Sequence, residues 1–116
     1  MAETSGDMAY FHVVRCVFGA PELLGKWTQW YETVHIPAIL AVPGMRSVTR
    51  YAEIGSDNSF LAVWEIDSPA VFDHPAYAEA RGWGPWEPYI REWSISLLEQ
   101  HRPERRSKPP ARETER

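Results

Sequence analysis

Four segments of the chain are either largely hydrophobic or alternate between hydrophobic and polar positions, and each of them predicts a β-strand. The first segment, from Ala9 to Phe18, contains no Gly or Pro and is rich in β-branched and aromatic residues. The other three cover residues 46–54, 60–66 and 92–99. Alternation along the first segment places one set of side chains on a single face, namely Tyr10, His12, Val14, Cys16 and Phe18.

A spacing of three and four residues replaces this alternation after Pro21 and predicts a helix. Pro37 prevents a regular continuation, because proline lacks the N–H group and clashes with the preceding turn. We therefore expect the helix to end before Pro37, with a kink or a new short helix through Leu40. His35 lies beside the apolar stripe of this helix, which consists of Leu23, Trp27, Trp30, Tyr31 and Val34.

The sequence Asp-Ser-Pro at residues 67–69 is suited to the start of a second helix. We expect this helix to break near His74 and Pro75 and to resume from Tyr77 to Arg81. Residues 82–86, Gly-Trp-Gly-Pro-Trp, predict an irregular aromatic loop before the last strand.

The predicted order of elements is β-α-β-β-α-β, which is typical of an α+β, ferredoxin-like fold with a four-stranded antiparallel sheet and both helices on one face. Both faces of the predicted strands carry apolar residues, so we expect a second copy to cover the open face. The expected assembly is a homodimer that forms an α/β barrel. We assign residues 9–99 to this domain, residues 1–8 to a flexible arm and residues 101–116 to a disordered charged tail.

Composition agrees with one globular domain, since the 116 residues are 44% hydrophobic and 24% charged. Residues 101–116 contain six Lys or Arg and three Glu, which leaves an acidic domain and argues against a nucleic-acid groove. No apolar run is long enough for a membrane span. The polar first residues and the single cysteine, Cys16, lead us to expect a cytoplasmic protein without a disulfide.

Aromatic residues are unusually frequent, with 6 Trp, 5 Tyr and 4 Phe. Because large aromatic side chains are seldom left in water, these residues predict a lined cavity, a self-association surface, or both.

The segment from Trp30 to Gly44, followed by Arg50 and Tyr51, resembles the W-Y-x-x-x-H-x-P-x-x-x-x-x-P-G core of EthD-like proteins in the dimeric α/β-barrel superfamily. With residues 72–77 and 82–86, the resemblance covers roughly residues 9–99. It implies a superfamily that includes cofactor-free monooxygenases, polyketide cyclases, muconolactone-type isomerases and haem-handling enzymes. A first-strand histidine recurs among the cyclase-like members, and His12 occupies a matching position.

Three residues are candidates for catalysis. His35 can transfer protons near neutral pH, because an unperturbed imidazole has a pKa of about 6.5; it could instead bond a carbonyl freed by Pro37. His12 lies mid-strand and needs a partner, either a ligand or a neighbouring side chain.

Tyr51, the third candidate, could donate to a developing oxyanion. Arg50, on the opposite face of the same strand, could bind a substrate carboxylate. Either of the last two could equally pack an interface.

Further aromatic and histidine residues are candidates for substrate binding, although each could instead simply seal the core. They are Tyr31, Trp64, His74, Tyr77, Trp83 and Trp86. The four histidines, His12, His35, His74 and His101, lack the helical pair spacing typical of metal sites, and no phosphate-binding glycine loop is present. We therefore expect neither a metal nor an organic cofactor.

The sequence thus predicts a cofactor-independent enzyme that uses histidine acid–base catalysis on a hydrophobic aromatic or polyketide-like substrate, of cyclase, isomerase, lyase or monooxygenase type. The alternative is a non-catalytic protein that binds a small apolar metabolite in the same pocket. A third reading is a structural dimer whose aromatic residues only fill its interior. The expected partners are the small substrate and a second copy, with no nucleic acid and no membrane.

Overall fold

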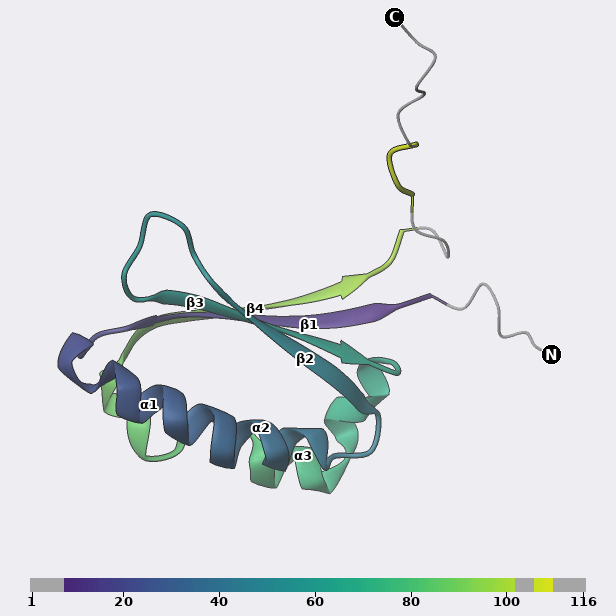
Figure 1. Ribbon diagram of the computed structural model, residues 1–116. Coiled ribbons are helices and arrows are strands. Elements are labelled where there is room, and N and C mark those ends of the chain that lie inside the picture. Colours follow the sequence, from purple (N-terminus) through teal and green to yellow (C-terminus); the bar gives the residue numbers. More distant parts are fainter. Residues whose placement is uncertain (1–7, 102–105, 110–116) are drawn as a thin grey trace, which may run out of the picture.

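Four strands form one antiparallel sheet in the order β2-β3-β1-β4 (Figure 1). The structure is a computed structural model that describes residues 8–101 and 106–109. The strands are β1 (Tyr10–Phe18), β2 (Met45–Ala52), β3 (Ser59–Ile66) and β4 (Ile90–Glu99). The central position of β1 is that of the ferredoxin-like fold, so the predicted fold class is confirmed.

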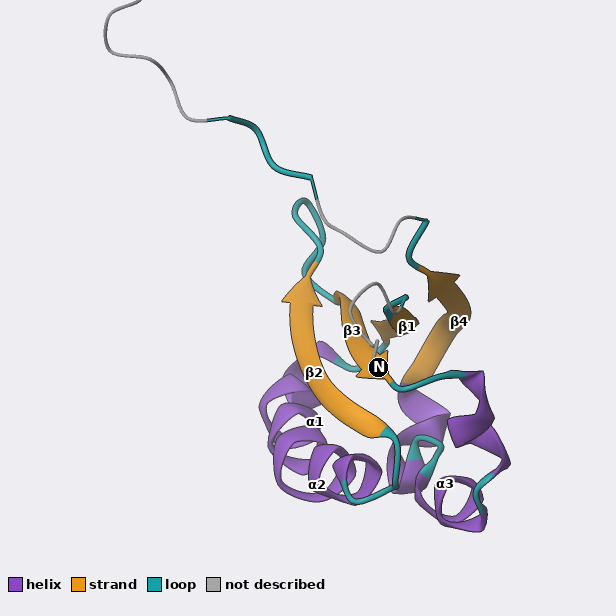
Figure 2. Cartoon of the chain, turned by 90° about the vertical axis from the view of Figure 1, so that its right-hand side faces the viewer, coloured by secondary structure: helices purple, strands orange, loops and turns teal. Residues whose placement is uncertain are grey.

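All helices lie on one face of the sheet (Figures 1 and 2). The first helical run consists of a 3-10 turn η1 (Pro21–Leu23), α1 (Leu24–Trp30), a π-helical segment η2 (Tyr31–His35) and α2 (Ile36–Leu40). The second consists of the 3-10 helix η3 (Pro69–Asp73) and α3 (Pro75–Ala80). The predicted loop after it contains a further 3-10 helix, η4 (Gly84–Tyr89).

The first helical run does not end before Pro37, in contrast to the prediction, but widens into the π-helical segment η2. There the N–H of Ile36 donates to the carbonyl of Tyr31, five residues back. This wider turn lets the chain pass the missing N–H of Pro37 and continue as α2. It also changes which residues face the sheet: Tyr31 and Ile39 are buried, whereas Val34 is 52% exposed. The predicted new short helix through Leu40 is confirmed as α2.

The core lies between the helices and the inner face of the sheet. Phe18 and Trp27 are fully buried and stack, with ring centroids 4.6 Å apart and an interplanar angle of 10°. Trp64 and Ile66 are nearly inaccessible on β3. The face of the first strand that carries His12, Cys16 and Phe18 is the inner one, since all three side chains are buried.

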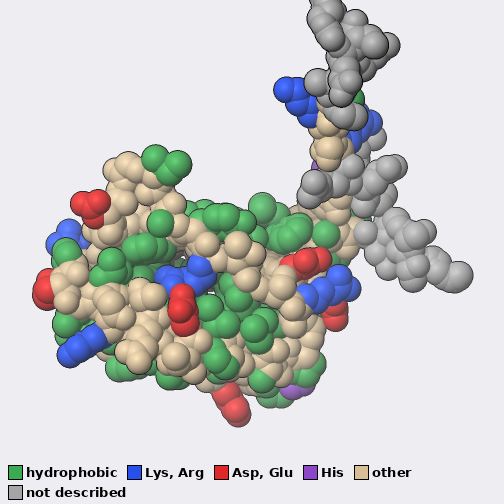
Figure 3. Space-filling view, viewed as in Figure 1, with side chains coloured by type: hydrophobic (Ala, Val, Ile, Leu, Met, Phe, Trp, Pro, Cys, Tyr) green, Lys and Arg blue, Asp and Glu red, His purple; other side chains and the backbone are tan. Residues whose placement is uncertain are grey.

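The opposite face of the sheet has no cover within the described residues. At its centre Val13 lies opposite Val63 on β3 and Ser96 on β4. Tyr51 lies on this face and is 52% exposed, and Leu98 is 49% exposed. Hydrophobic side chains also gather along the upper side of the molecule, over the sheet, in the space-filling view (Figure 3). This open face therefore presents apolar surface to its surroundings.

β4 is an edge strand, and the helix layer leaves its inner face partly uncovered. Trp93 and Ile95 lie opposite Cys16 and Val14 of β1, so they point toward the helices. They are nevertheless 56% and 50% exposed. Two large apolar side chains thus border a space between this edge of the sheet and the helices.

The predicted arm at residues 1–8 and tail at residues 101–116 lie largely outside the described residues. Residues 106–109 have no regular secondary structure and are exposed. None of the described helices has the length and apolar character that a bilayer crossing requires.

Candidate functional site

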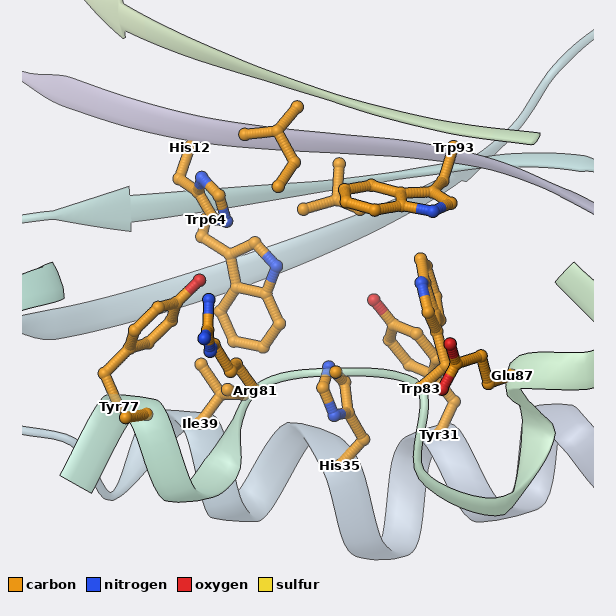
Figure 4. A pocket seen from close by; sticks show the side chains of 14 residues that line it. His12, Tyr31, His35, Ile39, Trp64, Tyr77, Arg81, Trp83, Glu87 and Trp93 are labelled. Carbon is orange, nitrogen blue, oxygen red and sulfur yellow. The ribbon is translucent and has the colours of Figure 1, made fainter. Parts of the chain in front are cut away.

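A cavity of about 340 Å³ lies between the sheet and the helices, on the side of β4. Its walls come from β1, β3 and β4 above and from η2, α2, α3 and η4 below (Figure 4). It is lined by His12, Val14, Tyr31, His35, Ile39, Trp64, Tyr77, Ala78, Arg81, Gly82, Trp83, Glu87, Trp93 and Ile95. This volume and this mixture of aromatic rings with a few polar groups are typical of small-molecule sites.

His35 forms the floor of the cavity. It is the last residue of the π-helical segment, and the wide turn places it on the sheet-facing side of the helix. Its ring stacks on Trp30 at a centroid distance of 5.3 Å and meets the Trp64 ring edge-on at 6.3 Å. These aromatic contacts fix the plane of the imidazole, since no hydrogen bond to either of its nitrogens is present among the described residues.

The His35 imidazole is held in its neutral form. Burial lowers its pKa to about 4, and the positive charge of Arg50 acts in the same direction. At neutral pH the ring is therefore unprotonated and has a lone pair available to accept a proton.

Arg50 lies on β2 and faces the helices, outside the lining of the large cavity. Its guanidinium lies 4.1 Å from the centroid of the Tyr31 ring and 5.4 Å from that of Trp27. One of its nitrogens is 3.7 Å from a carboxylate oxygen of Glu32. Arg50 thus packs against rings of the core and acts on His35 through its charge.

His12 and Tyr77 form one end of the cavity. The His12 ring lies 4.9 Å from Phe72 and 6.5 Å from Tyr77, centroid to centroid. Burial lowers the pKa of His12, and its Nδ1 atom is sealed without a hydrogen-bond partner among the described residues. Burial also raises the pKa of Tyr77, whereas the charge of Arg81 lowers it. Both side chains are therefore neutral at pH 7.

The cavity holds two charged residues that the sequence analysis missed. Arg81 follows α3 directly, and its backbone N–H donates to the carbonyl of Tyr77. Four-residue spacing places these two side chains on one side of the helix, a signal that was present in the sequence. Glu87 belongs to η4, whose irregular path gave no such signal. Arg81 and Glu87 lie at opposite ends of the cavity, with His35 between them (Figure 4).

The structure brings most of the predicted site residues to this cavity. Those that line it are His12, His35, Tyr31, Trp64, Tyr77 and Trp83. Three others do not. Tyr51 points to the open face of the sheet. His74 is exposed and caps α3, with its Nδ1 accepting the N–H of Ala76 at 3.0 Å. Trp86 packs against Phe18 and Tyr89 in the core.

Metal ligands do not cluster in the described part of the chain, where no three His, Cys, Asp or Glu side chains meet in a way that could hold an ion. The cavity's own titratable groups are spread over its floor and two ends, so the arrangement suits acid–base chemistry on an organic molecule.

No family model and no curated protein matches the sequence. Solved structures match its fold. A dimeric ferredoxin-like protein from an uncultured marine organism has a TM-score of 0.62 at 11% identity, over 78% of this chain and 86% of that one. SnoaB, a cofactor-independent oxygenase from Streptomyces nogalater, has a TM-score of 0.56 at 16% identity, over 90% and 99%. Rv0793 from Mycobacterium tuberculosis has a TM-score of 0.57 at 15% identity, over 91% and 99%. At these identities the likeness shows the ferredoxin-like fold.

Proposed function

We propose that the protein is a cofactor-independent enzyme in which His35 removes a proton next to a carbonyl group of a hydrophobic, ring-bearing substrate. The observation that carries this proposal is a neutral imidazole in the floor of an aromatic cavity. A closed apolar cavity of about 150 Å³ can take up benzene. The larger cavity beside His35, about 340 Å³, has room for a molecule of two rings.

The chemistry begins with one proton transfer. His35 accepts a proton from the substrate carbon, and the electron pair of the broken C–H bond moves into the carbonyl to give an enolate. The enolate can then attack another carbon of the molecule, regain a proton elsewhere, expel a leaving group, or pass electrons to O2. These four continuations correspond to a cyclase, an isomerase, a lyase and a monooxygenase.

A monooxygenase-type reaction has one support beyond the site. SnoaB shares this fold and is a cofactor-independent oxygenase, so the fold accommodates oxygen chemistry without a bound cofactor. The motif from Trp30 to Gly44 resembles EthD-like proteins, and that resemblance implies a superfamily that also includes cyclases and isomerases. Removal of a proton is the step that all four reaction types share, and we propose it as the activity of this protein. We also propose that the protein is a cytoplasmic homodimer.

Hydrogen–deuterium exchange of 2-tetralone tests this step directly. This two-ring ketone has acidic C–H groups beside its carbonyl, and NMR in D2O follows their exchange. We expect the protein to accelerate exchange above buffer. His35→Gln should lower the acceleration by about 10²-fold or more, whereas the matched variant His101→Gln, at an exposed position outside the cavity, should leave it unchanged.

Two outcomes contradict the proposal: wild-type protein that leaves the exchange rate at its buffer value, or a His35→Gln variant that retains full acceleration. Binding of 2-tetralone without any exchange would favour the alternative of a non-catalytic binding protein.

A further inference from the structure

The two ends of the cavity differ in charge. Arg81, Tyr77 and His12 meet at one end, and Glu87 lies beside Trp83 at the other (Figure 4). Arg81 is close enough to Tyr77 for its charge to lower the pKa of the phenol. A ligand in the cavity therefore meets a cation at one end and a carboxylate at the other.

Arg81 has no anionic partner within the described residues 8–101 and 106–109. The ion pairs found there involve Arg15, Arg46 and Arg50. Arg81 lines the cavity and is exposed to solvent, and its charge is unpaired among these described residues. Guanidinium groups form strong, directional bonds with carboxylates and other oxyanions.

The groups around Arg81 add donors without adding charge. Tyr77 stays protonated at neutral pH because burial raises the pKa of its hydroxyl, which can then donate to an oxygen. His12 is neutral, and a neutral imidazole carries one N–H donor. This end of the cavity thus provides one positive charge and two neutral polar groups, a combination that suits a single negatively charged oxygen.

We propose that the cavity binds an organic anion of about two rings, with its ionised oxygen on Arg81 and its rings between Trp64, Trp83 and Trp93. Glu87 repels the anionic group from the opposite end and so fixes the orientation of the ligand. In that orientation the rings lie over His35, between the two ends. This inference deepens the proposed function by naming the substrate class, and it rests on that function only in taking the cavity as the ligand site.

Calorimetric titration at pH 7.5 with 2-naphthoate and 2-naphthamide tests the inference. The two probes have the same rings, and only the first is charged. We expect 2-naphthoate to bind at least about tenfold more tightly, as a charge-assisted hydrogen bond predicts. Arg81→Gln should remove this preference and leave 2-naphthamide binding within about twofold of wild type.

Arg91→Gln is the matched control, because Arg91 on β4 is exposed like Arg81 but lies outside the cavity lining, and the variant loses the same charge. It should alter binding of neither probe. Glu87→Gln should leave 2-naphthoate binding equal or tighter.

The inference is overturned by equal affinity for the two probes, by an Arg81→Gln variant that keeps the preference for 2-naphthoate, by an Arg91→Gln variant that loses it, or by no measurable binding of 2-naphthoate. These measurements involve no turnover. A failure of His35 as the base, seen in the exchange assay, would therefore leave the anion site standing, and the reverse also holds.

Discussion

His35 shows how the surroundings of a side chain can prepare it for chemistry. The ring is enclosed by Trp30, Tyr31 and Trp64, and burial among these rings disfavours the charged imidazolium. Arg50 adds to the effect from behind the Tyr31 ring. The imidazole is consequently a weaker base than that of a free histidine, but at neutral pH His35 is unprotonated in nearly all protein molecules.

The lowered pKa of His35 also makes folding depend on pH. The folded protein binds the proton only near pH 4, whereas the unfolded chain binds it near pH 6.5. The stabilising contribution is therefore complete above pH 6.5 and is lost as the pH falls to about 4. Over that range we expect His35 to lower the free energy of unfolding by about 3 kcal/mol.

Urea unfolding of wild type and His35→Gln at pH 7 and pH 4 measures this contribution. Other groups titrate in both proteins, so their difference isolates His35. The wild type should lose about 3 kcal/mol more than the variant between the two pH values. Identical losses in the two proteins would contradict the burial of a neutral imidazole.

At the scale of elements, the alternating strands and the two interrupted helical runs follow from the sequence, because periodicity records which face is buried. The π-helical turn could not be read in this way. Because of this turn, Tyr31, His35 and Ile39 face the sheet. The regular α-helical period predicts Val34 on that face, but Val34 is exposed. Pro37 indicates where the regular α-helical spacing must change, but it does not indicate that the chain forms a π-helical turn there.

The choice between Tyr51 and Arg50 was also beyond the sequence. The two side chains point to opposite faces of β2, and either face could have been the inner one. In the structure the Arg50 guanidinium packs against the rings of Tyr31 and Trp27 on the inner face. Tyr51 therefore lies on the open face. Arg81 differs from these two residues, because its four-residue spacing from Tyr77 is a sequence signal for a shared helix side.

Gly44 lies in the turn between α2 and β2, where the backbone conformation requires a glycine. It has a φ of +97°, and a Cβ there would meet Val71 Cγ2 at 3.0 Å. We expect Gly44→Ala to destabilise the protein by about 1–3 kcal/mol. Gly25→Ala, in α1 with nothing within 4 Å, should stabilise it by up to about 1 kcal/mol.

Thermal and urea unfolding of the two variants give the comparison. Opposite signs are expected for the same chemical change. A Gly44→Ala variant as stable as wild type would show that the turn between α2 and β2 relaxes freely.

At the scale of the molecule, the open face of the sheet supports assembly into a homodimer, as we propose. Val13 lies at the centre of this face, between Val63 and Ser96. A charge placed there would lie inside the interface, so Val13→Asp should convert a dimer into a monomer of 13.4 kDa. Val34→Asp, at an exposed helical position, should leave the dimer intact.

Light scattering coupled to gel filtration measures the mass, and circular dichroism checks that each variant is folded. A monomeric wild type would rule out the dimer, as would a Val13→Asp variant that keeps twice the chain mass.

The pH dependence of 2-tetralone exchange tests the central claim, a neutral His35 that accepts a proton inside the cavity. The value of kcat/KM reports the pKa of the free enzyme's base, and the ketone itself does not ionise in this range. We predict a constant kcat/KM from pH 8 down to about pH 5 and half of that value near pH 4. A fall centred near pH 6.5, the value of an exposed histidine, would contradict the account.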